Sequence, residues 1–326
     1  MDLSAPIIPV IRVNGLQQMA EPESFRGIII KGVGGIYTVR FEVNGIYKYG
    51  LCAARGQFRL KGIKPAIGDK VTIIPSGDPD VEYVITDIAD RSSFIARPPV
   101  ANLSVMLLTF SVTEPAPDLT LLDKMLLVCS LRDIRPVIIF TKSDLNGSDS
   151  ERLCSVYTKA GYEVLVSSPQ KPITKNDLKD IIGDGIAAFA GPSGVGKSTL
   201  CNSLLGFDLM ETGEVSAKIK RGRHTTRHVE LHEFFDGFIC DTPGFTSLSL
   251  EDQGVDYRDV LYGFPEITAI ATGCRFDDCS HRKEDGCVVR NALAEGLLDQ
   301  GRYERYTAFY TELYDNRNNY RHRRKQ

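Results

Sequence analysis

Short segments in which hydrophobic and polar positions alternate follow one another from Phe25 to Asp90. Glycine, asparagine and proline turns separate these segments at a spacing that is typical of the strands of a small β-barrel. We therefore expect residues 24–96 to form an all-β, OB-like barrel, a fold that binds nucleic acid through its strand faces and loops. The segments that carry this prediction are GIIIKGVGGIYTVRFEV, GIYKYGLCAARG and DKVTIIPS.

The pattern changes beyond RPPVANL (97–103), a linker interrupted by prolines, where continuous apolar runs begin to alternate with segments of helical periodicity. This rhythm is typical of a mostly parallel sheet covered by helices, so we expect an α/β nucleotide-binding domain over residues 97–262. Its predicted strands are SVMLLTF, PVIIF, YEVLVSS, IAAFAG and GFICDTPG, and its predicted helices include LTLLDKMLLVCSL and STLCNSLLGF.

Helical spacing replaces the strand pattern after Gly254. It predicts a mostly α-helical domain over residues 263–326, with a polar, basic tail from Asn316 that we expect to be mobile. Residues 1–23 show neither pattern, and we expect an extension or a disordered start there. The chain is thus predicted to be multidomain. The segments that indicate helices are VDYRDVLYGFPEITAIAT, NALAEGL and DQGRYERYTAFYTELYDN.

The composition, with 42% hydrophobic and 25% charged residues, is that of a folded globular protein. The sequence has no apolar run of about eighteen residues and no basic start with a small-residue cleavage site, so we expect a cytoplasmic protein without a membrane partner. Positive charge collects in residues 26–70, with nine Lys or Arg against two acids, and in residues 301–326, with seven against three. Two basic regions indicate a polyanionic partner, although charges that only keep the barrel soluble are the alternative.

A phosphate-binding loop is indicated by GPSGVGKST, because it follows the apolar strand IAAFA and precedes a helical segment. Glycines let the backbone N–H groups face the phosphates, Lys197 would reach the β and γ phosphates, and the Ser198 hydroxyl would ligate Mg²⁺. A chance glycine-rich turn is the alternative. The predicted phosphate-binding residues are Gly191, Pro192, Ser193, Gly194, Val195, Gly196, Lys197, Ser198, Thr199 and, from the later DTPG motif, Gly244.

DTPG begins with Asp241, which follows the strand GFIC. In proteins that bind nucleoside triphosphates through a phosphate-binding loop, an aspartate in this position holds Mg²⁺. The backbone of Gly244 can sense the γ-phosphate. An ordinary turn is the alternative. The strand and its distance after the phosphate loop favour the functional interpretation.

TKSD, which begins at Thr141, ends the strand PVIIF. Asp144 could accept both N–H groups on the guanine edge while the stem of Lys142 covers the ring, which would select guanine over adenine. A plain loop after a buried strand is the alternative. Ser167 and Ser168, after the strand YEVLV, are further candidates for a base contact.

A metal site is predicted from CRFDDCSHRKEDGC. Three thiolates and one imidazole suit a tetrahedral, closed structural Zn²⁺ site, which would hold the C-terminal helices together. Unrelated buried or surface thiols are the alternative. The predicted zinc ligands are Cys274, Cys279, His281 and Cys287.

The base-reading motif precedes the phosphate loop, whereas Ras-like GTPases have the opposite order, so the sequence resembles the circularly permuted P-loop GTPases. GPSGVGKST, GRHTT, DTPGF, FPEI, CRFDDCSH and GRYERY together resemble the bacterial RsgA family of ribosome-dependent GTPases. The guanine motif begins with Thr141 where the family commonly has Asn. The resemblance implies an OB barrel, a permuted GTPase domain and a zinc module, in this order.

The family further implies a protein that binds GTP and GDP, the small (30S) ribosomal subunit and 16S rRNA, and that acts in late subunit maturation by ribosome-stimulated, Mg²⁺-dependent hydrolysis of GTP. The sequence does not fix the oligomeric state, and we take a monomer as the default. An RNA-binding assembly checkpoint protein that only senses GTP or GDP is the alternative. A P-loop kinase or ATPase is disfavoured by TKSD.

The resemblance also points to residues for hydrolysis besides Lys197. Phe245 stands where Ras-like enzymes have the glutamine that orients water, so intrinsic hydrolysis is expected to be slow. His224 is implied to position the water once a partner orders its loop, and an RNA-facing or solvated histidine is the alternative. Thr225 and Thr226 are both candidates for binding Mg²⁺ and the γ-phosphate.

Overall fold

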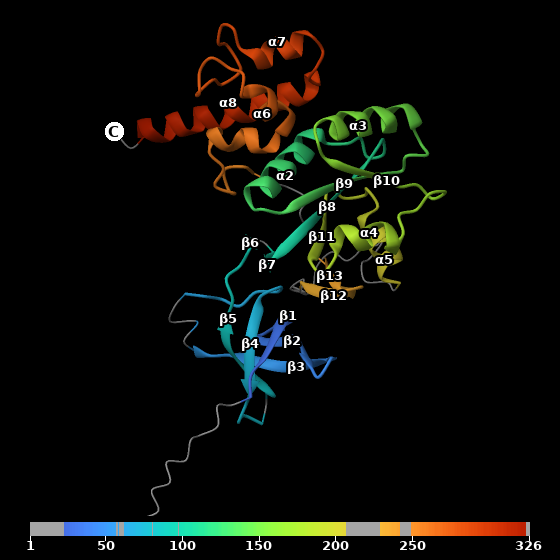
Figure 1. Ribbon diagram of the computed structural model, residues 1–326, viewed down its shortest axis with the longest axis vertical. Helices are drawn as coiled ribbons and strands as arrows, with labels where there is room; N and C mark the ends of the chain where they lie inside the picture. Colours follow the sequence, from blue (N-terminus) through green and yellow to red (C-terminus); the bar gives the residue numbers. More distant parts are fainter. Residues whose placement is uncertain are drawn as a thin grey trace, which may run out of the picture.

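The computed structural model describes residues 23–56, 58, 62–79, 81–96, 98–206, 229–241 and 249–323 of the chain. Figure 1 shows an elongated arrangement of three units, with a β-barrel at one end, an α/β domain in the middle and a helical unit at the other end. We call the last unit, residues 249–323, the C-terminal module. No helix in the described ranges combines the length and the apolar composition needed to cross a membrane.

The N-terminal unit is a five-stranded barrel, as the alternating pattern predicts. It closes because β1 pairs with both β2 and β4, and because β5 pairs with both β3 and β4. Ile29, Val39 and Ile85 are fully buried in its core. The segments singled out from the sequence omit β5, which is short and has an irregular burial pattern. The strands are β1 (Phe25–Val33), β2 (Ile36–Val43), β3 (Ile46–Ala54), β4 (Lys70–Pro75) and β5 (Tyr83–Ile88).

The expected linker at 97–103 contains a strand. Pro99–Ala101 (β7) pairs with Phe94–Ala96 (β6) in a two-stranded sheet. The backbone N–H of Ala101 donates a hydrogen bond to the carbonyl of Ile67 in the barrel, at 2.8 Å. The connection is therefore anchored to the barrel by backbone pairing, which prolines at its start do not prevent.

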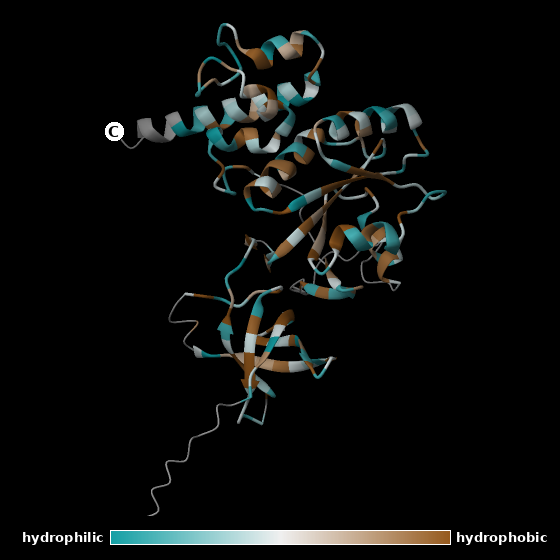
Figure 2. Cartoon of the chain, in the orientation of Figure 1, coloured by the Kyte–Doolittle hydropathy of each residue, from teal (hydrophilic) through white to brown (hydrophobic). Residues whose placement is uncertain are grey.

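The middle unit contains the predicted parallel sheet. In space the strands run in the order β10-β9-β8-β11-β13-β12, with β12 antiparallel to β13. Figure 2 shows the parallel strands of this sheet as largely hydrophobic, in contrast to β12. The bounds are β8 (Leu103–Ser111), β9 (Arg135–Thr141), β10 (Glu163–Val166), β11 (Ile186–Ala190), β12 (Glu230–Phe234) and β13 (Gly237–Asp241).

Helices cover both faces of this sheet, as alternate residues of β8 show. Met106 and Leu108 pack in one cluster with residues of α2 and α3, whereas Val105 and Leu107 pack in another with residues of α4 and α5. The helices α3 and α4 are not among the predicted segments, because their residues are mostly polar. The bounds are α2 (Leu119–Leu131), α3 (Gly147–Lys159), α4 (Lys175–Ile182) and α5 (Lys197–Leu205).

The order of the strands positions the nucleotide site. The chain moves outward from β8 to β9 and β10, then returns to place β11 on the other side of β8. Such a reversal creates a crevice at the carboxyl ends of the strands, where ligands of open α/β sheets bind. All the predicted base and phosphate motifs that are described follow strand ends at this edge.

The C-terminal module is helical, as predicted, but its first helical segment is divided. A 3-10 helix, η2 (Tyr257–Gly263), ends before Pro265, which starts α6 (Pro265–Ala271), because proline cannot continue a helix from the preceding turn. The remaining helices are α7 (Val288–Ala294) and α8 (Gln300–Arg323). The last of these continues beyond Asn316, so the expected mobile tail begins as helix.

Candidate functional site

The phosphate-loop motif forms the turn between β11 and α5. Gly191 has φ 137°, and a Cβ atom there would lie 2.0 Å from the carbonyl oxygen of Thr109 on β8. Only glycine fits a backbone that approaches the neighbouring strand this closely. Gly196 precedes α5 with φ 94°, which is also a conformation that favours glycine. The sequence therefore places the N-terminus of α5 beside the loop, where backbone N–H groups can bind an anion.

Lys197 lies against its own loop. Its ammonium group donates hydrogen bonds to the carbonyl oxygens of Gly191, at 2.8 Å, and Pro192. Burial lowers the pKa of Lys197, because desolvation disfavours the charged form. The ammonium group is thus held against the backbone of its own loop.

The other loop residues differ in exposure. Gly191 and Val195 are buried. Pro192, Gly196 and Ser198 are half-buried, whereas Ser193, Gly194 and Thr199 are exposed.

The guanine motif contacts the phosphate loop directly. The hydroxyl of Thr141 is buried and donates to the carbonyl of Val195 at 2.6 Å. The ammonium group of Lys142 donates to the carbonyls of Gly194, at 3.1 Å, and Glu114. Thr141 thus braces the phosphate loop from the position where the family commonly has Asn. The carbonyl of Glu114 is a contact that sequence patterns do not reveal, since any residue type provides it.

The candidate base-binding loops are also brought together. The backbone N–H and the hydroxyl of Ser143 both donate to the carbonyl of Ser167, at 3.3 and 3.2 Å. Ser168 lies in the same turn and exchanges backbone hydrogen bonds with Lys171. Asp144 is exposed beside this turn, so its carboxylate is available to a ligand.

One of the remaining predicted residues lies at the same edge of the sheet as the phosphate loop. Asp241 is the last residue of β13, and β13 is parallel to β11, which leads into that loop. The other four, His224, Thr225, Thr226 and Gly244, lie outside the described residues.

The predicted zinc ligands form one compact cluster. The ligand atoms of Cys274, Cys279, His281 and Cys287 all lie within 4.8 Å of one another. Nδ1 of His281 is 3.5 Å from Sγ of both Cys274 and Cys287, and these two sulfur atoms are 3.9 Å apart. A tetrahedral Zn²⁺ with Zn–S distances of about 2.3 Å and Zn–N of about 2.0 Å separates its ligand atoms by about 3.5–3.8 Å. The donor set therefore fits zinc in its chemistry, and the separations among Cys274, His281 and Cys287 are close to those of a tetrahedral site.

Surrounding contacts prepare His281 as a ligand. Burial lowers the pKa of His281, which favours the neutral imidazole that binds metals. The hydroxyl of Tyr303 on α8 donates to the carbonyl of His281 at 2.7 Å. Glu284 accepts hydrogen bonds from the backbone N–H groups of Ser280, Arg282 and Lys283. The loop that carries the ligands is thus held in shape by α8 and by its own carboxylate.

Comparisons with known proteins agree with this architecture. The family model described as RsgA GTPase matches residues 88–251, and the RsgA N-terminal domain matches residues 26–80. The chain is 40% identical over 295 residues to the small ribosomal subunit biogenesis GTPase RsgA of Clostridium perfringens, covering 90% of this chain and 99% of that protein.

Two crystal structures are also similar. YloQ, described as a circularly permuted GTPase, has 34% identity and a TM-score of 0.74, and the match covers 90% of this chain and 96% of YloQ. YjeQ from Thermotoga maritima has 28% identity and a TM-score of 0.74, with 89% and 99% covered. The chain therefore belongs to the RsgA family of GTPases and has the circularly permuted form of the GTPase fold.

Proposed function

We propose that this RsgA-family GTPase binds the small (30S) ribosomal subunit in the cytoplasm, as a monomer, and hydrolyses GTP to time its release during late maturation of that subunit. The observation that carries the proposal is the direct bonding of the guanine motif to the phosphate loop, through Thr141 and Lys142. It occurs in a chain that matches a named subunit-biogenesis GTPase over 90% of its length.

The site residues receive the following roles in this proposal. The residues Gly191 to Thr199 bind the phosphates, with Lys197 on the β and γ phosphates. Ser198 would ligate the Mg²⁺ that accompanies GTP, together with Asp241, and the ion would supply charge stabilisation at the phosphates. Gly244 would contact the γ-phosphate. Lys142, Asp144, Ser167 and Ser168 would bind guanine, and Thr141 would support them through the phosphate loop.

The flanking units provide the proposed contacts with 16S rRNA. We assign the barrel to residues 24–96, the GTPase domain to 97–262 and the zinc-binding domain to 263–326, and the matches of the family models to 26–80 and 88–251 support the first two ranges. One structural Zn²⁺ would be held by the three cysteines and His281. Lys and Arg contacts to RNA phosphates would make subunit affinity fall as salt rises.

GTP turnover by the purified protein tests this function. We would measure it alone, with small subunits and with large subunits, using Lys197→Ala as the inactive control. Strong stimulation by small subunits alone is the expected result. Tight GTP binding with slow turnover that neither subunit accelerates would contradict the proposal, and would favour an RNA-binding checkpoint protein that senses nucleotide.

His224 is the proposed water-positioning residue of the stimulated reaction. His224→Ala should abolish stimulation by small subunits and leave GDP affinity unchanged. Stimulated turnover at the wild-type rate would show that the assignment is wrong. Separate Thr225→Ala and Thr226→Ala variants, assayed for Mg²⁺-dependent GTP binding, identify which hydroxyl contacts the ion.

A further inference from the structure

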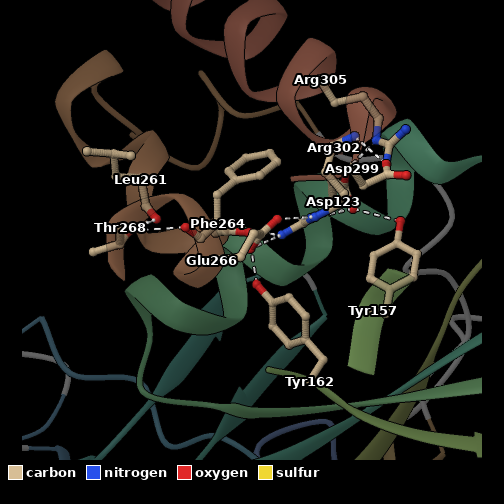
Figure 3. A network of polar contacts seen from close by, with 11 residues as sticks. Asp123, Tyr157, Tyr162, Leu261, Phe264, Glu266, Thr268, Asp299, Arg302 and Arg305 are labelled. Atoms are coloured by element: carbon tan, nitrogen blue, oxygen red, sulfur yellow. Dashed lines mark hydrogen bonds and ion pairs between the residues drawn. The ribbon is translucent and has the colours of Figure 1, made fainter. Parts of the chain in front are cut away.

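Helix α8 places a charged side chain inside the protein, at the contact between the C-terminal module and the GTPase domain. Arg302 is 1% exposed, and its guanidinium lies 2.7 Å from a carboxylate oxygen of Asp123 and 2.7 Å from one of Glu266 (Figure 3). The ring centroid of Phe264 is 4.3 Å from the guanidinium carbon. Buried charges require well-defined partners, because removing one partner leaves the other without compensation. The position of Arg302 is therefore tightly specified.

Asp123 belongs to the GTPase domain, in α2, and is fully buried. Its carboxylate also accepts hydrogen bonds from the hydroxyl of Tyr157 on α3, at 2.9 Å, and from Nε of Arg305 on α8. One carboxylate thus joins two helices of the GTPase domain to the C-terminal module, as Figure 3 shows.

A second contact fixes how the module lies on α2. The carbonyl of Gly263 accepts hydrogen bonds from the hydroxyl of Tyr162, at 2.8 Å, and from Arg302, at 2.9 Å. A Cβ atom at Gly263 would lie 2.7 Å from the Cβ of Leu127 on α2. The backbone at Gly263 and helix α2 lie so close together that neither can slide past the other. The module therefore has one defined position along α2.

The other end of α2 leads to the nucleotide site. Asp118 caps the helix by accepting a hydrogen bond from the backbone N–H of Leu121, at 2.9 Å. Asp123 lies five residues after this cap, which corresponds to about 7.5 Å of helix. A displacement of Asp123 would therefore be transmitted through little more than one helical turn.

The segment before the cap touches both parts of the nucleotide site. The carbonyl of Glu114 accepts a hydrogen bond from Lys142 of the guanine motif. The ring of Pro115 lies 3.8 Å from the position that a Cβ atom would take at Gly194 in the phosphate loop. A shift of α2 along its axis would reach these two residues through Ala116 and Pro117, which join them to the cap.

We propose that the Arg302–Asp123 contact positions α2, and through Glu114 positions Lys142, so that the C-terminal module controls the affinity of the site for guanine nucleotides. Asp123 and Arg302 are positioning residues, since they would act on the nucleotide through α2. By thermodynamic linkage, a partner that binds the module and shifts α8 changes nucleotide affinity, and nucleotide changes the affinity for that partner by the same factor. This inference rests on the assignment of Lys142 to the guanine site, which is part of the proposed function.

Titration of the full-length protein with fluorescently labelled GDP tests the proposal. Asp123→Asn keeps the volume of the side chain and removes the charge that holds Arg302 and Arg305. It should weaken GDP binding about fivefold, the lower end of typical couplings between sites. The KM for GTP should rise by the same factor, while kcat of the basal reaction stays unchanged. A purely structural role would lower the melting temperature without changing the Kd of the folded protein.

Tyr162→Phe serves as a milder variant, because it removes only the hydroxyl that bonds to Gly263 and keeps the core filled. If Asp123→Asn does not fold, Tyr162→Phe should still weaken GDP binding, by a smaller factor than the one expected for Asp123→Asn. Unchanged GDP affinity in the folded variants would overturn the proposal.

Two further variants distinguish a specific role of the buried contact from a general loosening of α8 on α2. Glu312→Gln removes the partly exposed ion pair with Lys124, 3.8 Å apart, which also joins α8 to α2. It should not alter GDP affinity, and a loss equal to that of Asp123→Asn would contradict a specific role for the buried contact. Lys142→Ala should weaken GDP binding strongly. If it does not, the guanine-site assignment itself fails, whereas failure of Asp123→Asn alone overturns only the coupling between the module and the site.

Discussion

The barrel and the C-terminal module both contact the GTPase domain through charged side chains, but they bury these charges to different extents. On the barrel side, the side chains of Lys31 and Glu230 are 44% and 34% exposed. On the module side, those of Arg302 and Asp123 are 1% and 0% exposed. Exposed ion pairs contribute about 0–1 kcal/mol and are screened by salt, whereas breaking a buried pair costs about 3–5 kcal/mol. The Arg302–Asp123 contact of the module is thus shielded from water, whereas the Lys31–Glu230 contact of the barrel is open to it.

Removal of the proposed Zn²⁺ should have the largest effect on this comparison, because its four predicted ligands all lie in the module. Structural Zn²⁺ sites in small domains contribute about 10–16 kcal/mol of apparent binding free energy. Cys287→Ala, or treatment with a chelator, should therefore abolish hydrogen-exchange protection in α6, α7 and α8 and leave it intact in β1–β5. Metal analysis should find one zinc per chain in the wild type.

Cys154→Ala is the matched control for the metal site, since Cys154 lies on α3 outside the cluster. It should retain both zinc and protection. If protection of the module survives complete loss of metal, packing alone holds the module together.

Substitution of the buried arginine should have the next largest effect. Burial by itself would lower the pKa of Arg302, but Asp123 and Glu266 outweigh it and raise the pKa, so the guanidinium stays charged at all working pH values. Arg302→Met leaves two carboxylates without this partner and should reduce the free energy of unfolding by about 3–5 kcal/mol. Denaturant titration measures this loss.

Arg258→Met is the control for loss of an arginine at the surface. Arg258 pairs with Asp256, and its side chain is 66% exposed. The loss should be much smaller than that of Arg302→Met, because solvent screens an exposed pair. If Arg302→Met and Arg258→Met lose the same free energy of unfolding, burial does not determine how much these contacts contribute.

The smallest effect is expected at the contact between the barrel and β12. Glu233 accepts hydrogen bonds from Tyr49, at 2.6 Å, and Arg40, at 2.9 Å, but its side chain is 48% exposed. Glu233→Gln should reduce the free energy of unfolding by at most about 1 kcal/mol, and by less at high salt. Denaturant titration at low and high salt, compared with wild type, measures this difference.

The same carboxylate predicts the direction of a pH effect. The pKa of Glu233 is lowered, first by the Tyr49 hydroxyl and then by Arg40. A carboxyl with a lowered pKa in the folded state stabilises the protein above its unfolded pKa, about 4.3, and loses this contribution as pH falls through the folded value. The difference between wild type and Glu233→Gln should therefore disappear in acid. A difference that grows in acid would contradict this role of the Glu233 carboxylate.

The parts of the fold and site that depend on local pattern could be predicted from the sequence. Gly191 and Lys197 lie in a motif whose glycines and helix start are determined by neighbouring residues. The four predicted zinc ligands likewise lie in one short segment, from Cys274 to Cys287. The helix at 119–131 has the predicted bounds because its apolar residues and the Asp118 cap are local signals.

Contacts between distant segments could not be predicted in the same way. Asp123 and Arg305 are 182 residues apart, and nothing in the pattern around either names the other. A single acidic residue within the apolar helix LTLLDKMLLVCSL was nevertheless a signal, because a buried carboxylate needs a cationic partner. GRYERY supplies that partner twice, in Arg302 and Arg305. The pairing of β12 with the barrel strand β1 likewise depends on tertiary structure, since β12 is short and carries polar residues.

The place of β8 in the sheet has a consequence for the order in which the protein is built during translation. Among the strands of the parallel sheet, β8, β9 and β10 leave the synthesising ribosome first. One edge of the buried strand β8 is paired only by β11, which follows later in the chain. Until β11 is made, one edge of β8 has no partner strand. The phosphate loop that Thr141 contacts is also absent at that stage. Because domains generally fold as units during synthesis, we expect that a nascent chain cannot bind nucleotide until translation has passed the phosphate loop.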